Sequence, residues 1–507
     1  MADGARYLLG LDAGNTVIKA VLFDAEGRQL AARALDGSSV SPAPGRVERD
    51  IDELWANAGE VIRACITDAG IAPEEIAAVG CAGHGNGLYL VDDAGASVIG
   101  IQSLDTRASE MARTLADQAG DALFDLCLQK PWPSQTPMLL AWLKRHAPEV
   151  YSRAATVMLC KDVITFRLTG ARTSDVSDMS GCGLVRMPDG VYDDRLLSLY
   201  GLEDAAGMLP RLVGPTEVAG HVTRDAALAT GLAPGTPVIA GFFDVIASAL
   251  GSGVATPGEA SLIVGTWSIN QVVSTAPITS QEVFMVARYG DDRFMNIESS
   301  ATSAANLEWY IRELVERGAH HDDPFGQCAA QIARITPARD DPIYLPFLYG
   351  SRLGSEFRAG LYGLGGWHGE GHVLRAILEG VMFEHRRHVE VLHSAGVKLR
   401  SATLSGGGTR SPVWPQMFAD GLGLPVRVAD SQETGALGAA MGASVAAGFY
   451  DDLETAAAAM ARTKTRLTPD PAMQAHFDAR YRRFLAVRDA MRPLWAEDAR
   501  TQAAQGG

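Results

Sequence analysis

The first forty residues alternate between apolar runs and short polar breaks in the manner of β-strands. Leu8–Leu11 is apolar, the polar stretch Asp12-Ala-Gly-Asn follows, and Thr16–Asp24 is again strand-like. Ala25–Arg28 is a turn signal, and Gln29–Leu35 continues the pattern. The chain is therefore predicted to begin with a β-meander.

A helix and a buried strand are predicted next. Leu54–Ala69 carries apolar residues on one stripe, at positions 54, 58, 61, 62 and 65, which is the spacing of an amphipathic helix. Ile76–Ala82 predicts a buried strand that ends in the glycine-rich sequence GHGNG. Much of 106–235 is helical or irregular in pattern.

The middle of the chain repeats the layout of its beginning. Pro237–Gly253 changes from a strand to a small-residue helix, with Asp244 at the junction. A strand, a short loop at 265–266 and a second strand follow, just as Gly10 is followed by a polar turn and a strand. Because Gly10 and Gly265 lie about half the chain apart, we expect two similar halves facing each other across a cleft.

The second half continues the alternation of helices and strands. Residues 401–430 predict a strand, a triple-glycine turn, a helix and a strand, and a small-residue helix follows Glu433. The stretch 451–507 is charged and rich in alanine, which is typical of terminal helices with a frayed end. A long helix is predicted from Gly371 because residues at positions 373, 377, 381 and 385 recur at helical spacing.

Size and composition limit the class of protein. With 507 residues, the chain is too long for one ordinary core, so two or more domains are expected. The net charge of −16 argues against a nucleic-acid or anionic-membrane partner. Six scattered cysteines without a CxxC pair favour reduced, mostly buried thiols. Since no apolar run reaches the roughly 20 residues of a membrane helix, a cytoplasmic location is expected.

The polar stretch Asp12–Asn15 has two interpretations. Its residues are ordinary in a β-hairpin loop, yet they also occur in loops whose backbone amides face a phosphate. The loop joins two strands, unlike the strand-to-helix loop of dinucleotide-binding folds, and the sequence has no GxxxxGK[ST] motif. Further glycine-rich turns at 265–266 and 406–408 also follow apolar strands, and together these turns predict a nucleotide bound between two α/β domains.

Several segments occur together in the order of one known family. These segments are GLDAGNTVIKAVLFD, GFFDV, GTW, SGGGTRSPVWPQMFAD and, separated by seven residues, Ala359–Leu364 and His372–Glu379. The chain resembles the FGGY carbohydrate kinases over residues 6–450. The resemblance implies an α/β fold of two ribonuclease-H-like, actin-type ATPase domains with a cleft between them. The expected parts are a sugar-binding domain at 1–254, a nucleotide-binding domain at 255–450, and C-terminal helices and a tail at 451–507. One departure is Leu139, which replaces the usual lysine of a K-L-x-W-L run and which we interpret as structural.

The resemblance also implies roles for residues around a nucleotide. Asp244 matches the family's general base, although a residue at this junction can also cap the helix expected near Val245. Asp12 is expected to hold Mg²⁺ through water. Lys19 can equally be a solvated strand lysine, and the glycines can equally form tight turns. The residues expected at the nucleotide are Asp12, Gly14, Asn15, Thr16, Lys19, Gly265, Thr266, Gly406, Gly407, Gly408 and Ser411.

Two further segments match the sugar-facing parts of the family, AGHGNG (82–87) and SLDTR (103–107). Each polar residue in them is otherwise an ordinary loop residue. AHHDDP (319–324) and EHRRH (384–388) are interpreted as a solvated loop and a helix face, not as metal sites. The residues expected at the substrate are His84, Gly85, Asp105, Arg107 and Asp244.

The predicted function is transfer of the γ-phosphoryl group of ATP to a terminal hydroxyl of an open-chain sugar or polyol. Phrases such as LPFLYGS look most like kinases of L-xylulose and 3-keto-L-gulonate, whereas LAWLKRHAPEV is similar to erythritol kinases. The competing hypothesis is an ATP-driven binding protein of the actin or chaperone type, or an inactive sugar sensor, because these proteins share the fold. ATP and Mg²⁺ are the expected cofactors, a small sugar or polyol is the expected partner, and a homodimer is one assembly that we consider.

Overall fold

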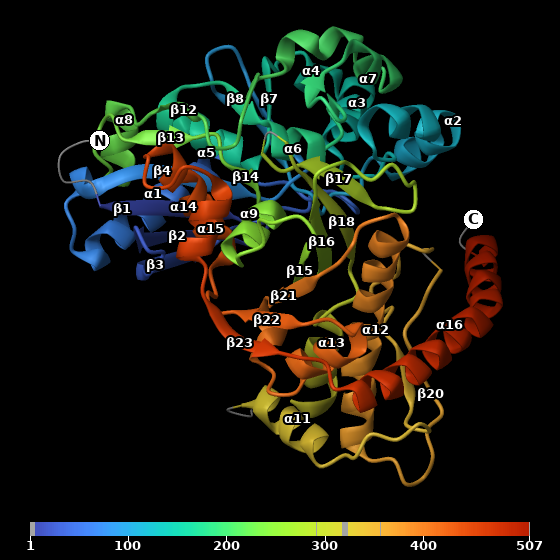
Figure 1. Ribbon diagram of the computed structural model, residues 1–507. Helices are drawn as coiled ribbons and strands as arrows, with labels where there is room; N and C mark the ends of the chain where they lie inside the picture. The colour runs from blue at the N-terminus through green and yellow to red at the C-terminus, as the bar shows by residue number, and fades with distance from the viewer. Residues whose placement is uncertain (1–5, 291, 317–322, 355, 506–507) are drawn as a thin grey trace. The chain divides into compact units, whose positions relative to one another are not determined.

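The computed structural model describes residues 6–290, 292–316, 323–354 and 356–505 (Figure 1). The chain forms two compact units, and each is described by itself below. The first unit comprises Met1–Pro257, Val273–Asn296 and Glu433–Arg462, and the second comprises Gly258–Val272, Ile297–Gln432 and Thr463–Gly507. Both units contain sheets covered by helices, as the predicted α/β class requires.

The first unit is built on a mixed sheet with the strand order β12-β13-β4-β1-β2-β3, and β14 also pairs with β4. β1, β2 and β3 are antiparallel neighbours, which confirms the predicted meander, whereas β4 runs parallel to β1. The strands are β1 (Tyr7–Ala13), β2 (Val17–Asp24), β3 (Gln29–Asp36), β4 (Ile76–Gly83), β12 (Val218–His221), β13 (Pro237–Ile239) and β14 (Phe242–Phe243).

Helix α1 (Ile51–Ala69) covers one face of this sheet. Leu11 and alternate residues of β1 and β2 are fully buried in one core with the apolar stripe of α1. The helix begins one turn before its predicted start because the side chain of Asp50 accepts hydrogen bonds from the backbone N–H groups of Asp52 and Glu53.

The predicted helix of small residues, α14 (Thr434–Ala446), covers the opposite face. Gly10 in β1 and Gly80 in β4 point toward α14, since side chains alternate along a strand, and a Cβ at either glycine would meet the backbone of α14. Gly438 of α14 lies in the same way against the backbone of α9 (Asp244–Gly251). The small residues therefore allow backbone-to-backbone packing on both sides of α14.

The other elements of the first unit include the small sheets β6-β5-β7, β8-β11 and β9-β10. Leu139 is fully buried, in agreement with its structural interpretation. The strands are β5 (Leu88–Val91), β6 (Ser97–Ile101), β7 (Thr156–Met158), β8 (Thr173–Asp175), β9 (Val185–Arg186), β10 (Val191–Tyr192), β11 (Arg211–Val213) and β17 (Met285–Arg288). The helices are α2 (Ser109–Cys127), α3 (Thr136–His146), α4 (Pro148–Tyr151), α5 (Cys160–Thr169), α6 (Val176–Gly181), α7 (Asp194–Leu199), α8 (Arg224–Thr230) and α15 (Leu453–Met460).

The second unit repeats the strand arrangement of the first. Its sheet contains the strand order β18-β16-β15-β21-β22-β23, in which β15 is antiparallel to β16 and parallel to β21. β1 has the same relation to β2 and β4, so the predicted internal repeat is present. The strands are β15 (Glu259–Val264), β16 (Ser268–Ser274), β18 (Phe294–Ser300), β19 (Ile343–Leu345), β20 (Gly360–Tyr362), β21 (Ser401–Ser405), β22 (Val426–Ala429) and β23 (Thr463–Leu467).

The helices of the second unit are α10 (Ala305–Tyr310), α11 (Pro324–Ala333), α12 (Glu370–Ser394), α13 (Trp414–Leu422) and α16 (Pro471–Gln505). α12 is the long helix predicted from Gly371, and most of its residues are buried. All six cysteines are buried and unpaired, as their spacing predicts. Across the described ranges, none of the helices combines the length and the apolar character that a membrane crossing requires.

Candidate active site

Three neighbouring strands of the first unit end at one edge of its sheet. β4 runs parallel to β1 on one side and to β14 on the other, with Ala82 paired to Asp12 and to Phe242. His84 and Asp244 follow these strands directly. Ligands of α/β sheets bind at the carboxyl ends of parallel strands. The strand register therefore brings Asp12, His84 and Asp244, three residues predicted from the sequence, to the same sheet edge.

Asp244 is the first residue of α9, and Phe243 occupies the capping position before it. The helix thus starts at Asp244 itself rather than near Val245. Burial and, to a smaller extent, the Asp12 carboxylate raise the pKa of Asp244 to about 8, while a hydrogen bond with the Val245 backbone lowers it. A half-buried carboxyl group at a strand end, beside a second carboxylate, is typical of an acid–base site.

Asp12 lies between the sheet edge and the start of α14. A Cβ at Gly435 would meet the Asp12 carboxylate, which places that carboxylate at the helix N-terminus, where negative charge is favoured. Lys19 Nζ is 2.8 Å from Glu433 Oε2, so Lys19 is held in an ion pair. Burial raises the pKa of Asp12 to about 6, while the Lys19 charge lowers it and the Glu433 charge raises it.

The groups around Asp12 fit a magnesium ion that is bound mostly by water and phosphate. Mg²⁺ commonly binds proteins through one or two carboxylates and keeps several waters. In the part of the chain that the structure describes, no group of three or more His, Cys, Asp or Glu side chains could hold a metal. Of the AHHDDP segment, residues 319–322 lie outside the described residues.

The loop after β1 has the geometry of a hairpin turn. The Gly14 N–H donates to the carbonyl three residues further on, at 3.0 Å. Asn15 Nδ2 donates to Ser103 Oγ at 2.9 Å, so this side chain joins the loop to the SLDTR segment. Thr16 is exposed. The hairpin interpretation is therefore correct for the backbone, and it leaves the predicted phosphate contacts of Gly14, Asn15 and Thr16 untested.

His84 begins the glycine-rich loop after β4, and it is only 2% exposed. Its backbone N–H donates to the end of β1, and its Nε2 lies 2.9 Å from the hydroxyl of Tyr89. Burial and the nearby Arg49 charge lower the pKa of His84 to about 4, so its ring is neutral at pH 7. Gly85 packs on the ring of Phe243, which leaves no room for a side chain.

Asp105 and Arg107 bind each other. The Asp105 side chain is fully buried, and its two oxygens accept hydrogen bonds from Nε and Nη2 of Arg107 at 2.9 and 2.8 Å. Asp105 Oδ2 also accepts from the Val47 backbone at 2.6 Å, and Arg107 Nη2 donates to Glu48 at 2.7 Å. These contacts hold the segment before α1 in place. Substrate contacts of Asp105 and Arg107 remain a prediction.

The two glycine-rich turns of the second unit lie next to each other. Turn 265–266 follows β15 and turn 406–408 follows β21, and these strands are parallel neighbours. Gly406 has a φ angle of +88°, and a Cβ there would lie 2.9 Å from the carbonyl oxygen of Val264. Gly408 also packs closely on Val264. Glycine is therefore needed for the close approach of the two turns, as the tight-turn interpretation requires.

Several polar groups of these turns have partners inside the second unit. The carbonyl of Gly265 accepts a hydrogen bond from the Ala304 backbone at 2.9 Å, while Thr266 is exposed. Ser411 Oγ accepts a hydrogen bond at 3.3 Å from the backbone N–H of Trp414, the first residue of α13. Contact of Thr266, Gly407 or Ser411 with a nucleotide remains a prediction.

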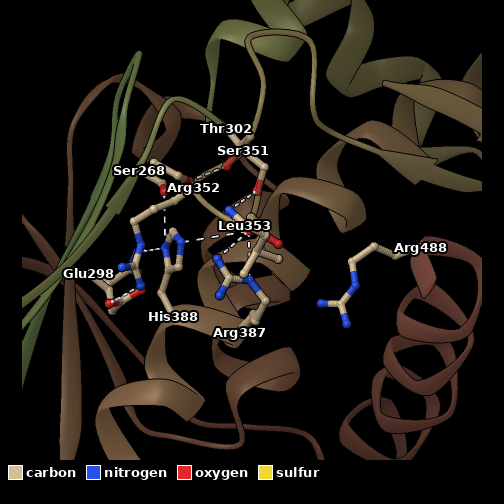
Figure 2. Close-up of polar contacts among 12 residues, drawn as sticks. Ser268, Glu298, Thr302, Ser351, Arg352, Leu353, Arg387, His388 and Arg488 are labelled. Atoms are coloured by element: carbon tan, nitrogen blue, oxygen red, sulfur yellow. Dashed lines mark hydrogen bonds and ion pairs between the residues drawn. The ribbon is translucent and has the colours of Figure 1, made fainter. Parts of the chain in front are cut away.

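The histidines of EHRRH lie in a buried polar network of the second unit. Figure 2 shows His388 of α12 pointing toward Ser268 of β16, and its Nδ1 lies 3.3 Å from Ser268 Oγ and 2.8 Å from Asn270 Nδ2. His385 Nδ1 lies 2.7 Å from Asn270 Oδ1. Burial lowers the pKa of both histidines. They therefore support the strand that follows turn 265–266, and EHRRH is a largely buried helix face.

Two charged residues near the first unit's site have no role in the sequence prediction. Glu433 binds Lys19, which is 414 positions away in the sequence, and Arg49 Nη1 donates to the carbonyl of Gly14 at 2.9 Å. An acidic residue directly before a helix of small residues was the available signal for Glu433. No pattern marks Arg49, because its partner is a backbone carbonyl.

Comparison with known proteins gives a consistent result. The model of the FGGY family of carbohydrate kinases matches residues 7–251 with its N-terminal domain and 260–447 with its C-terminal domain. The L-xylulose/3-keto-L-gulonate kinase of Escherichia coli is 35% identical, over 94% of this chain and 96% of that protein. A probable L-xylulose kinase of Pasteurella multocida is 34% identical, over 96% of this chain and 99% of that protein. The crystal structure of xylulose kinase from Rhodospirillum rubrum is similar, with a TM-score of 0.88, 30% identity, and coverage of 97% of this chain and 100% of that one.

Proposed function

The chain belongs to the FGGY family of carbohydrate kinases, and from this premise we propose that it phosphorylates a terminal hydroxyl of an open-chain sugar of the xylulose or 3-keto-gulonate type. The protein is an ATP-dependent sugar kinase of the α/β, actin-type ATPase fold. The substrate class is supported by the names of its relatives, which are kinases of L-xylulose, 3-keto-L-gulonate and xylulose.

The observation that carries the proposal is the placement of Asp12 and Asp244 at one sheet edge of the first unit. Phosphoryl transfer needs a group that takes the proton of the attacking hydroxyl and a group that manages phosphate charge. Two carboxylates with different surroundings can divide these tasks. Asp244, whose pKa is raised to about 8 by burial, takes the first task, and Asp12, which faces the Lys19 charge, takes the second.

In the proposed mechanism, Asp244 accepts the proton of the substrate hydroxyl as that oxygen forms its bond to the γ-phosphorus. The bond from phosphorus to the bridging oxygen of ADP breaks in the same step. Asp12 would hold Mg²⁺ through water, and the ion would neutralise charge on the phosphate oxygens. Because the Asp12 carboxylate contributes to the raised pKa of Asp244, neutralising Asp12 also lowers that pKa toward the working pH.

The glycine-rich turns are proposed to bind the nucleotide through their backbones. The loop of Gly14, Asn15 and Thr16 in the first unit would contact phosphate, as would Gly265 and Thr266 in the second. Gly406, Gly407, Gly408 and Ser411 would approach the adenine and ribose. Support comes from the three glycines of turn 406–408, which carry no side chains, and from the close packing of this turn on the end of β15.

A coupled ADP-release assay tests the proposal. Purified protein is supplied with MgATP and, separately, with each enantiomer of xylulose, ribulose and 3-keto-gulonate, and with erythritol, xylitol and glycerol. We expect sugar-dependent ADP release with a xylulose or 3-keto-gulonate acceptor, and loss of that release in Asp244→Asn. ADP release independent of any acceptor would support the ATP-driven binding protein instead, and release with erythritol alone would overturn the substrate class.

A further inference from the structure

A group of fully buried charges lies in the first unit, on residues to which the sequence assigns no role. Lys161 in α5 is 0% exposed, and its Nζ lies 2.5 Å from Asp162 Oδ1 and 2.9 Å from Asp175 Oδ1. The carboxylate of Asp178 in α6 is also buried, with Oδ2 3.7 Å from the same nitrogen. Breaking a buried ion pair is strongly destabilising, because it leaves an uncompensated charge away from water. These charges therefore hold α5 and α6 firmly together.

The buried ammonium also fixes the start of α6. Asp175 precedes this helix, and its Oδ2 accepts a hydrogen bond from the Ser177 backbone N–H at 2.6 Å, which caps α6. Its other carboxylate oxygen binds Lys161, so one side chain joins the helix to the buried charge. A Cβ at Gly83, the last residue of β4, would lie 2.8 Å from the Lys161 backbone nitrogen. Lys161 therefore connects α6 to the end of β4, where the proposed site lies.

Helix α6 contacts the residue before the proposed base in two places. The side chain of Ser177 is buried, and its Oγ accepts a hydrogen bond from the Phe243 backbone N–H at 3.3 Å. A Cβ at Gly181, the last residue of α6, would lie 3.0 Å from the Phe243 ring. Burial raises the pKa of Asp178, and the Asp244 charge contributes to this rise, so α6 lies within electrostatic range of the base. Both the backbone and the ring of Phe243 are therefore held by α6.

We propose that Ser177 is a positioning residue for phosphoryl transfer, its hydroxyl fixing the backbone before Asp244 and so the place of the Asp244 carboxylate. The proposal rests on the proposed role of Asp244 as the base. A general base must lie within hydrogen-bond distance of the proton that it accepts, and a small displacement of a reacting group lowers the rate steeply. Phe243 occupies the cap position of α9, and its apolar side chain offers no capping group. The start of α9 therefore depends on contacts from neighbouring elements, of which the Ser177 hydroxyl is one.

Ser177→Ala, with Ser180→Ala as its matched control, tests the proposal. Ser180 is also buried on α6, and its Oγ accepts a hydrogen bond at 2.8 Å from the backbone N–H of Arg288, in β17, which does not lead to Asp244. Ser177→Ala should lower kcat about tenfold, with the KM for ATP and for the best acceptor within about twofold, because a base acts in the transfer step. Ser180→Ala should keep kcat within about twofold. Both variants should lower the melting temperature slightly and by similar amounts, as for one buried hydrogen bond.

A double variant shows whether the hydroxyl acts through the base. In single turnovers, adding Ser177→Ala to Asp244→Asn should change the residual rate less than about twofold, because the carboxylate that Ser177 positions is already gone. A tenfold fall in this background as well overturns the proposal, since Ser177 then acts on the unit as a whole.

The remaining outcomes separate positioning from folding and from the function itself. An unchanged kcat in Ser177→Ala overturns the proposal, and so do equal falls in kcat in Ser177→Ala and Ser180→Ala. If Asp244→Asn loses turnover while Ser177→Ala behaves as wild type, only the positioning role fails. Wild-type turnover in Asp244→Asn removes the base on which the proposal rests, whereas a wild type without acceptor-dependent ADP release contradicts the proposed function.

Discussion

Replacing Asp244 by asparagine removes a charge and keeps the shape of the side chain. The pKa of Asp244 in the folded protein is about 8, raised from 3.8 by burial and by the Asp12 charge. A carboxyl group whose pKa rises on folding stabilises the folded state fully only below its unfolded pKa, and this contribution is lost as the pH rises through the folded pKa. Asp244→Asn should therefore make the protein more stable, and the gain should grow between pH 4 and pH 8.

The structure sets an upper limit on this gain. A pKa rise from 3.8 to about 8 corresponds to on the order of 5 kcal/mol at high pH, since one pKa unit is about 1.4 kcal/mol. Burying the asparagine amide opposes the gain by about 1–3 kcal/mol. We therefore expect a net stabilisation of about 3 kcal/mol at pH 9 and none at pH 4.5, where the charge contributes only about 1 kcal/mol.

Thermal unfolding of wild type and Asp244→Asn from pH 4.5 to 9, without nucleotide or metal, measures this difference. Asp193→Asn is the matched control, because the hydrogen bond from Arg195 holds the pKa of Asp193 well below its usual range. A lowered pKa stabilises the protein above about pH 4, so Asp193→Asn should lose a constant amount between pH 5 and 9. A difference between Asp244→Asn and wild type that does not change with pH would refute the assigned environment of Asp244.

The same variant separates the chemical step from binding. Asp244→Asn should lower kcat by about 10²–10⁴-fold with little change in the KM for ATP, because a general base acts only in the transfer step. In the wild type, kcat/KM should rise with pH and level off above about pH 8, because the pKa of the Asp244 carboxyl group in the free enzyme is about 8. Wild-type turnover in Asp244→Asn would remove this residue from the mechanism.

Three further changes probe the rest of the site. Lys19→Met should raise the Mg²⁺ concentration needed for half-maximal rate, more at pH 6.5 than at pH 8, because Lys19 lowers the pKa of Asp12; equal effects at both pH values would contradict this. Gly438→Ala should reduce stability in thermal unfolding by about 1–3 kcal/mol, because its Cβ meets the backbone of α9, whereas Gly366→Ala, with open space around it, should be neutral; similar melting temperatures would contradict the packing. Asp105→Asn should destabilise the protein by about 3 kcal/mol because Arg107 loses its charged partner, and an unchanged melting temperature would contradict this pairing; a rise in the acceptor KM would in addition support the predicted substrate contact.

Local patterns predicted most of the elements around the site. The meander at the start of the chain, the strand of Ile76–Ala82 and the helix from Gly371 follow from hydrophobic periodicity, and the structure has them within a few residues. The start of α1 was placed one turn late because the cap, Asp50, lies before the apolar stripe begins. Asp12 and Asp244 could be predicted as site residues because each lies at the end of an apolar run, and such runs predict strands.

Pairings over long distances in the sequence were not predictable in this way. The contact of Lys19 with Glu433 and the mutual binding of Asp105 and Arg107 depend on which loops the fold brings together. The structure pairs the oxygens of Asp105 with Arg107 and the Val47 backbone, and contact of Asp105 with a sugar stays a prediction. The sequence alone does not show whether a polar loop residue binds another part of the protein or a ligand.

By itself, the sequence indicated the family, the α/β class, the repeated strand–turn–strand layout, and the choice of Asp244 as candidate base and Asp12 as candidate magnesium ligand. These features depend on short-range periodicity and on motifs of neighbouring residues, which the chain carries directly. Only the tertiary structure decided that the two carboxyl groups share one sheet edge, that burial raises both pKa values, and that Lys19 pairs with Glu433. Burial, charge coupling and ion pairs depend on atoms that are close in space but distant in the chain.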